Sequence, residues 1–146
     1  MVRVGFVVFF VLVFAGLAYI RLAPSDTARW HVALANREPG NYPAQAGFEA
    51  YRVVSDPQIL IEFHRIASMT PHTTVLAGSP EAGMTTYVTR SRLMGYPDYT
   101  TAQLQNDGDG GFILAIHGRA RFGAGDMGVN QARITSWLEA LALPVN

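Results

Sequence analysis

Arginine side chains in the second half of the chain have the residue type and spacing that could support chemistry. Arg119 and Arg121 lie two residues apart in an alternating run, and Arg90 and Arg92 have the same spacing. Residues two apart on a β-strand share one face, so each pair would present two guanidinium groups together. The planar fork of N–H donors in a guanidinium group suits phosphate or carboxylate. The sequence therefore predicts an anion site built on arginine.

A glycine-rich turn follows the second arginine pair. Residues 123–128 read Gly-Ala-Gly-Asp-Met-Gly and precede a segment of helical periodicity. Free N–H groups at the start of that helix would add to an anion site, unless Asp126 already caps them. Asn130 shares a helical face with Ile134 and Trp137, so its amide is expected to point inward. The predicted ligand-binding set is Arg90, Arg92, Arg119, Arg121, Asp126, Asn130 and Arg133.

The same residues also allow a structural interpretation. Asp98, Asp126 and backbone carbonyls would then neutralise the arginines and fix the hairpins. Asn130 would be a buried polar contact that locks the last helix to the sheet, and Arg133 would pair with Asp126 or join the anion site. Both interpretations stay open at the level of sequence.

Composition excludes several kinds of chemistry. The chain has no Cys and no Lys among its 146 residues, which removes thiol nucleophiles, Cys-ligated metals and Schiff-base lysines. Eleven basic residues balance eleven acidic ones, so we expect no nucleic-acid partner. The four histidines show no metal-ligand spacing. Residues 123–128 match the G-x-G-x-x-G motif of dinucleotide-binding folds, but those folds have parallel strands and the strands here are expected to be antiparallel. We predict no metal, no cofactor and no catalytic residue.

The N-terminal segment is strongly apolar. Seventeen uncharged residues run from Val4 to Ile20 between Arg3 and Arg21, which is the short end of the range for a membrane span. A signal peptide cleaved after Ala18 is the alternative. Because the apolar run continues through Tyr19 and Ile20, we predict an uncleaved single-pass anchor in a bacterial inner membrane, with the domain in the periplasm.

Behind this anchor the pattern predicts an α+β fold. Strands are expected at residues 48–54, 73–77, 84–92, 99–105 and 112–121, with a helix from residues 55–57 to Met69 and another after Asp126. This gives an antiparallel twisted sheet of about five strands with two helices on one face, in the order β-α-β-β-β-β-α. The predicted parts are residues 1–21 (anchor), 22–47 (linker and irregular lead-in) and 48–146 (globular domain).

Two stretches resemble a known family. Residues 90–98, Arg-Ser-Arg-Leu-Met-Gly-Tyr-Pro-Asp, and residues 119–133, with their Arg, Gly, Asp and Asn positions, are similar to the family called domain of unknown function 1499. In that family the second motif joins the last strand to the last helix, and Ala120 here replaces its usual Ser. The Ser-Pro-Asn-Cys element found in many members is missing from this chain. The resemblance implies a bacterial envelope or organelle-membrane setting and brings no known activity.

The leading hypothesis is a membrane-anchored, non-enzymatic domain that binds an anionic small molecule, a lipid head group or a protein partner. One alternative is a purely structural interaction module of the envelope. Another is an enzyme acting on an anionic substrate, for which His117 or Asp126 would have to act as acid or base near the arginines.

Overall fold

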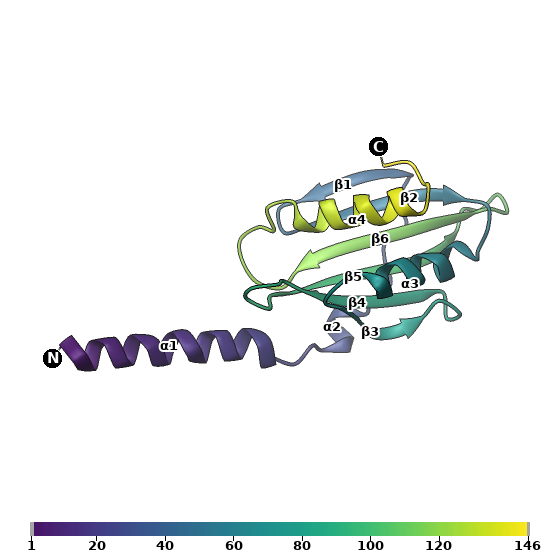
Figure 1. Ribbon diagram of the computed structural model, residues 1–146. Coiled ribbons are helices and arrows are strands. Elements are labelled where there is room, and N and C mark those ends of the chain that lie inside the picture. The colour runs from purple at the N-terminus through teal and green to yellow at the C-terminus, as the bar shows by residue number, and fades with distance from the viewer. Residues whose placement is uncertain (1, 146) are drawn as a thin grey trace.

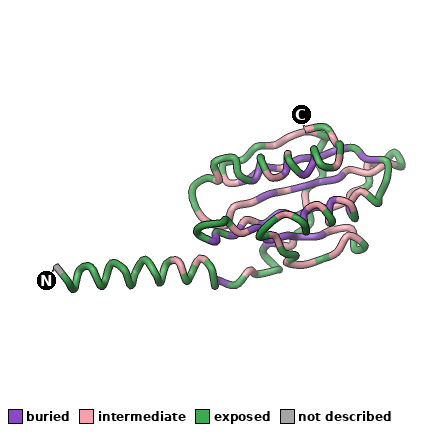
Figure 2. Tube along the Cα trace, in the orientation of Figure 1, coloured by how far each residue is buried: buried purple, intermediate pink, exposed green. Residues whose placement is uncertain are grey.

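The computed structural model describes residues 2–145 and begins with a long apolar helix. Helix α1 spans Val2–Leu22, and none of its apolar window is buried (Figure 1). Its stretch Arg3–Leu22 is long and apolar enough to cross a membrane, although a signal sequence meets the same criterion. Most of the helix is exposed along its length (Figure 2). The length and apolar composition of α1 therefore suggest membrane association.

A six-stranded antiparallel sheet forms the centre of the domain. Its order is β1-β2-β6-β5-β4-β3, in which β3 to β6 form a meander and β2 pairs with β6. The strands are β1 Gly40–Ala44, β2 Gly47–Val54, β3 Thr73–Ser79, β4 Met84–Arg90, β5 Pro97–Asn106 and β6 Phe112–Ala120. The predicted α+β class with an antiparallel sheet is confirmed, with β1 as an additional edge strand.

Two helices cover one face of this sheet. They are α3 Ile59–Met69 and α4 Val129–Ala140, which contact each other and run roughly along the strand direction (Figure 1). The buried α3 residues Leu60, Phe63 and Ala67 pack into the main core with the α4 residues Ile134, Trp137 and Leu138. Asp56 accepts the N–H of Gln58 at 2.8 Å as α3 begins, and Thr70 and Pro71 follow its end. Periodicity and capping residues therefore located both helices.

The other face of the sheet is covered by the residues that follow α1. We call residues 22–39 the lead-in segment; it contains the short helix α2, Thr27–Trp30, with Asp26 as its N-cap. Trp30 is 7% exposed and stacks on Tyr99 of β5, with ring centroids 3.9 Å apart. Farther along, the Leu34 N–H donates to the Gln103 side chain at 2.7 Å. This segment has little regular structure, yet it packs closely on the sheet. The division of the chain at residues 21 and 47 stays a prediction.

Candidate functional site

The sheet face beneath the lead-in segment carries part of the predicted arginine stripe. Leu114 and Ile116 of β6 belong to the core beneath the helices, so alternation places His117 and Arg119 on the opposite face. Arg119 lies opposite Tyr99 in the β5–β6 register. The arginine of β6 therefore faces the lead-in segment.

Arg119 holds the lead-in segment against the sheet. Its Nη2 donates to the Trp30 carbonyl at 2.7 Å and to the Thr101 Oγ1 at 2.9 Å. Its guanidinium carbon lies 5.4 Å from the centroid of the Trp30 ring, within range of a cation–π contact. Burial lowers the pKa of Arg119, while the charge of Glu49 raises it. The chain's own backbone and hydroxyl groups thus fill the place predicted for an anion.

Arg121 makes similar contacts nearer the end of α1. Its Nη1 donates to the Pro24 carbonyl at 2.9 Å and lies 3.4 Å from the carbonyl of Ala23. The same nitrogen is 3.2 Å from the Tyr99 hydroxyl. Arg121 therefore fixes the chain where α1 gives way to the lead-in segment.

Arg90 and Arg92 differ from each other in their surroundings. Arg90 donates through Nη1 to the Gly95 carbonyl at 2.9 Å and lies 3.5 Å from the Ile20 carbonyl. Arg92 is exposed in the β4–β5 loop, and its side chain makes no hydrogen bond or ion pair within residues 2–145. Of the four arginines predicted for the stripe, Arg92 alone has a side chain without a hydrogen-bond partner among the described residues, whereas the other three donate to carbonyl or hydroxyl groups.

The remaining predicted residues form a second cluster on the helix side of the sheet. Arg133 donates to Asp98 Oδ2 at 3.0 Å and to Asn130 Oδ1 at 2.9 Å, and Asn130 Nδ2 donates to Asp126 Oδ2 at 2.8 Å. Asn130 is fully buried. A Cβ on Gly118 would lie 2.8 Å from Asn130 Oδ1, so this glycine permits α4 to approach β6 closely. Arg133 thus pairs with Asp98 and not with Asp126.

The two carboxyl groups of this cluster have opposite pKa shifts. Burial raises the pKa of Asp98, against the lowering effect of Arg133. Burial also acts to raise the pKa of Asp126, but hydrogen bonds from Asn130 and Gly128 outweigh it and hold that pKa below its ordinary value. Asp126 accepts the backbone N–H groups of Gly128 at 3.1 Å and Asn130 at 3.0 Å. The start of α4 is therefore already capped by a carboxylate.

The structural interpretation of the sequence had Asp98 among the partners of the strand arginines. In the structure Asp98 lies on the other side of the sheet from Arg119. Asp98 pairs in register with Ala120, and its neighbour Tyr99 pairs with Arg119, so the side chains of Asp98 and Arg119 leave opposite faces. The predicted residues therefore make two groups: arginines under the lead-in segment, and the Asp98–Arg133–Asn130–Asp126 cluster under α4.

A cleft opens where α1 meets the domain, and we call it the α1 cleft. It has a volume of about 460 Å³. Its apolar walls come from the last turn of α1, the β4–β5 loop and the β6–α4 loop, and its polar groups include Asp98 and Asp126. The lining is Ile20, Ser91, Tyr96, Asp98, Ala120, Phe122, Gly123, Gly125, Asp126, Met127 and Val129. Sequence reasoning identified the glycine-rich turn but had no signal that α1 would form one wall.

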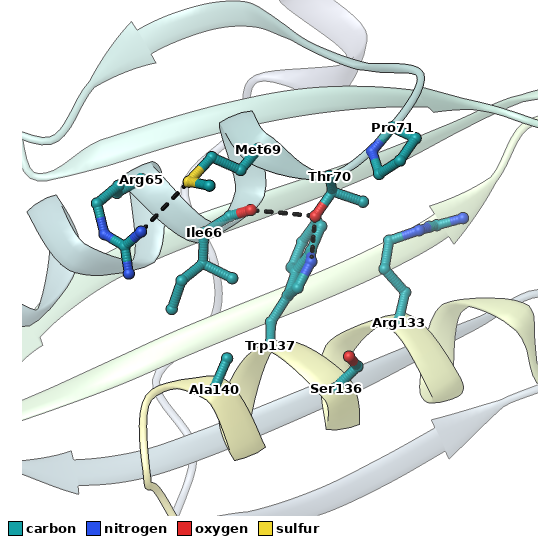
Figure 3. Close-up of a pocket in the computed structure, with 9 residues that line it drawn as sticks. All are labelled: Arg65, Ile66, Met69, Thr70, Pro71, Arg133, Ser136, Trp137 and Ala140. Carbon is teal, nitrogen blue, oxygen red and sulfur yellow. Dashed lines mark hydrogen bonds between the residues drawn. The ribbon is translucent and has the colours of Figure 1, made fainter.

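A second groove of about 490 Å³ runs between α3 and α4 (Figure 3). Trp137 at its base donates through Nε1 to the Thr70 Oγ1 at 2.9 Å. The two arginines beside it are already paired, Arg65 with Glu62 and Arg133 with Asp98. Because these charges are neutralised within the chain, the groove is the weaker place for an anionic ligand.

The histidines lie apart from both hollows. His117 Nε2 is 4.0 Å from Glu49, and burial together with the charge of Arg119 lowers the pKa of His117 to about 4. His117 is therefore neutral at pH 7, and it lies on the sheet face opposite Asp126. Within residues 2–145, no group of three or more His, Asp or Glu side chains has a metal-binding arrangement.

These features define a class of protein: one α+β domain with a six-stranded antiparallel sheet, behind an N-terminal apolar helix. Residues 36–141 match the family described as "Protein of unknown function (DUF1499)", and the chain belongs to that family. The resemblance carried by residues 90–98 and 119–133 is therefore confirmed. No curated protein and no solved structure matches the chain.

Proposed function

We propose that this is a membrane-anchored binding domain whose α1 cleft holds the acyl chain of an anionic amphiphile. The observation that carries the proposal is the position of Ile20, which belongs to the last turn of the apolar helix and also lines the cleft. A lipid chain leaving the bilayer beside α1 would meet this opening first. The cleft volume of about 460 Å³ lies within the range of about 300–1,000 Å³ typical of ligand pockets.

Two exposed arginines beside the opening could receive an anionic head group, while the carboxylates of the lining are engaged within the chain: Asp98 pairs with Arg133, and Asp126 caps α4. Arg92 is exposed and adjoins Ser91 at the cleft, and Arg21 is exposed at the end of α1. Arg21 donates to the carbonyl of Leu93 at 2.8 Å and keeps its positive charge. A phosphate at this opening would receive charge-assisted hydrogen bonds from these two arginines.

The other predicted residues contribute to the proposed site by shaping it. Arg90 and Arg121 bind carbonyls on either side of Arg21, at Ile20 and Pro24, and so position the wall supplied by α1. Asp126, Asn130 and Arg133 hold the β6–α4 loop against the sheet. Arg119 lies farther along the lead-in segment, and we assign it to fastening that segment.

Native mass spectrometry of the full chain tests the proposal. The chain would be reconstituted into lipid discs of phosphatidylglycerol or phosphatidylcholine and then released, and lipid adducts would be counted. We expect one phosphatidylglycerol that stays bound to each chain. Val129→Trp should reduce its affinity at least about tenfold, or ~1.4 kcal/mol, because Val129 lines the cleft and is 46% exposed.

Val53→Trp is the matched control, since Val53 is 58% exposed and lies outside the cleft lining. This control separates the cleft from lipids that surround α1, which both variants retain. Arg92→Gln should reduce the preference for phosphatidylglycerol over phosphatidylcholine. An adduct that survives Val129→Trp, or a chain released without lipid, would refute the proposed function.

A further inference from the structure

The end of α1 is fixed against two loops of the domain. Arg21 Nη2 donates to the Leu93 carbonyl at 2.8 Å, in the β4–β5 loop (residues 91–96). The ring of Tyr19 packs edge-on against Phe122 in the β6–α4 loop (residues 121–128), with centroids 6.1 Å apart. Figure 1 shows α1 leaving the domain on the side where these two loops lie. Any bilayer crossed by α1 therefore lies next to them.

The length of α1 sets the depth at which the loops lie. Its apolar stretch Arg3–Leu22 has 20 residues, about 30 Å at ~1.5 Å per residue. The hydrocarbon core of a bilayer is also about 30 Å thick. The helix would therefore leave the core near Leu22, where the two loops adjoin it.

These loops carry a cluster of exposed apolar side chains, which we call the apolar rim. Met127 of the β6–α4 loop is 98% exposed, and Leu93 of the β4–β5 loop is 82% exposed. The rim consists of Leu93, Met94, Tyr96 and Met127 in the loops, together with Val129 at the start of α4. An exposed apolar patch of this kind marks an interaction surface, and a tyrosine within it is typical of a membrane interface.

The distribution of charged side chains also favours an orientation in which the rim faces the bilayer. Exposed Arg21 and Arg92 flank the rim, and the one carboxylate in the rim loops, Asp126, accepts N–H groups at the start of α4, whereas the loops at the opposite end of the sheet are acidic. Those distant acidic residues are Asp56, Glu81, Asp107 and Asp109. The ten residues of β5 separate the two ends by about 34 Å, at ~3.4 Å per residue. An anionic bilayer would attract the arginine end and repel the acidic end.

We propose that the apolar rim inserts into the interface of the bilayer that α1 crosses, so that the domain is docked on the membrane. The expected insertion is about 5–10 Å below the head-group boundary, as for other interfacial apolar surfaces. Docking would place the mouth of the α1 cleft at the lipid surface. It does not depend on the cleft holding a ligand.

Because the chain has no Cys, single cysteines can report depth at chosen positions. Full-length Leu93→Cys and Met127→Cys would carry an environment-sensitive fluorophore in phosphatidylglycerol–phosphatidylcholine vesicles with quenchers at defined depths. Leu12→Cys, in the middle of α1, reports insertion of the helix, and Asp109→Cys reports the distant acidic end. We expect probes 93 and 127 to be blue-shifted and quenched by shallow quenchers, with probe 109 unaffected.

A second measurement guards against effects of the labels themselves. A probe at Ala124, exposed in the β6–α4 loop, should lose its shallow quenching when Leu93 and Met127 are both replaced by Glu. The charge-matched control is the double variant Val53→Glu and Val75→Glu, at two other exposed positions, and it should leave probe 124 quenched. Water-exposed probes at 93 and 127 would overturn the proposal, and so would an unquenched Leu12 probe. If the labels of two copies of the chain contact each other and the lipid quenchers have no effect, the rim is a dimer interface and the proposal is wrong.

Discussion

Replacing Arg119 with Met tests whether this arginine fastens the lead-in segment or binds a ligand. Methionine keeps much of the apolar stem and removes the guanidinium group. The variant loses the hydrogen bonds to the Trp30 carbonyl and the Thr101 hydroxyl. Because both bonds belong to the chain's own structure, we expect a lower free energy of unfolding even without any ligand.

The size of the loss follows from these contacts. Hydrogen bonds from a charged donor contribute about 1.5–3 kcal/mol each. The Trp30 carbonyl still accepts from Thr101 Oγ1 at 3.3 Å in the variant, so it keeps one partner. Removing a half-buried charge also relieves a desolvation cost, which the lowered pKa of Arg119 indicates. The expected net destabilisation is about 2 kcal/mol, a ~30-fold change in the folding equilibrium.

Urea unfolding of the full chain in detergent micelles measures this change. Trp30 fluorescence follows the lead-in segment in a Trp137→Phe background, because Trp30 stacks on Tyr99. Arg65→Met is the control: Arg65 is exposed, forms an ion pair with nearby Glu62 and donates to Met69 Sδ on the same helix, so its loss should cost less than ~1 kcal/mol. An unchanged free energy of unfolding in Arg119→Met would refute the fastening role. If that variant also lost a bound anionic lipid, Arg119 would belong to the ligand site.

Three further changes probe the remaining clusters. Gly118→Ala should destabilise the domain by about 1–3 kcal/mol in thermal unfolding, because its Cβ would lie 2.8 Å from Asn130 Oδ1; a wild-type melting temperature would contradict the close approach. Asp126→Ala should cost about 1–2 kcal/mol and speed amide exchange at Asn130, since Asp126 accepts that N–H; unchanged exchange would exclude the cap. His117 has a pKa lowered from 6.5 to about 4, so the folded state binds fewer protons than the unfolded state within that window. Stability should therefore fall as pH drops from about 6.5 to 4, by up to ~1.4 kcal/mol per pH unit, and His117→Gln should flatten this dependence.

The local sequence pattern predicts most elements of the fold but does not predict β1. The strands of the meander are rich in β-branched and aromatic residues and are bounded by turn residues, and the apolar residues of α3 repeat at helical spacing, so local sequence alone locates them. Strand β1 has five residues, includes Gly40 and Pro43, and pairs only with β2 at the edge of the sheet. An edge strand with a proline has no buried face of its own and therefore leaves no alternation to detect.

The sequence predicted the arrangement of the candidate site only where a single strand sets the sheet face on which each side chain lies. Alternation along β6 placed His117 and Arg119 on the face away from the core, which is correct. The ion pair between Asp98 and Arg133 joins residues 35 positions apart, and no local pattern links them. The wall that α1 supplies to the cleft depends on how the lead-in segment crosses the sheet, which side-chain periodicity does not encode.

The arginine contacts explain why a charge pattern resembled an anion site. A segment without regular structure leaves backbone carbonyls that need donors when it packs on a sheet. Arg119 and Arg121 supply those donors to the lead-in segment at the carbonyls of Trp30 and Pro24. One guanidinium group can donate several hydrogen bonds in a fixed plane, which suits carbonyls as well as it suits phosphate. Residue type and spacing therefore could not distinguish the two partners, because the partner here is the chain's own backbone, about 90 positions away in the sequence.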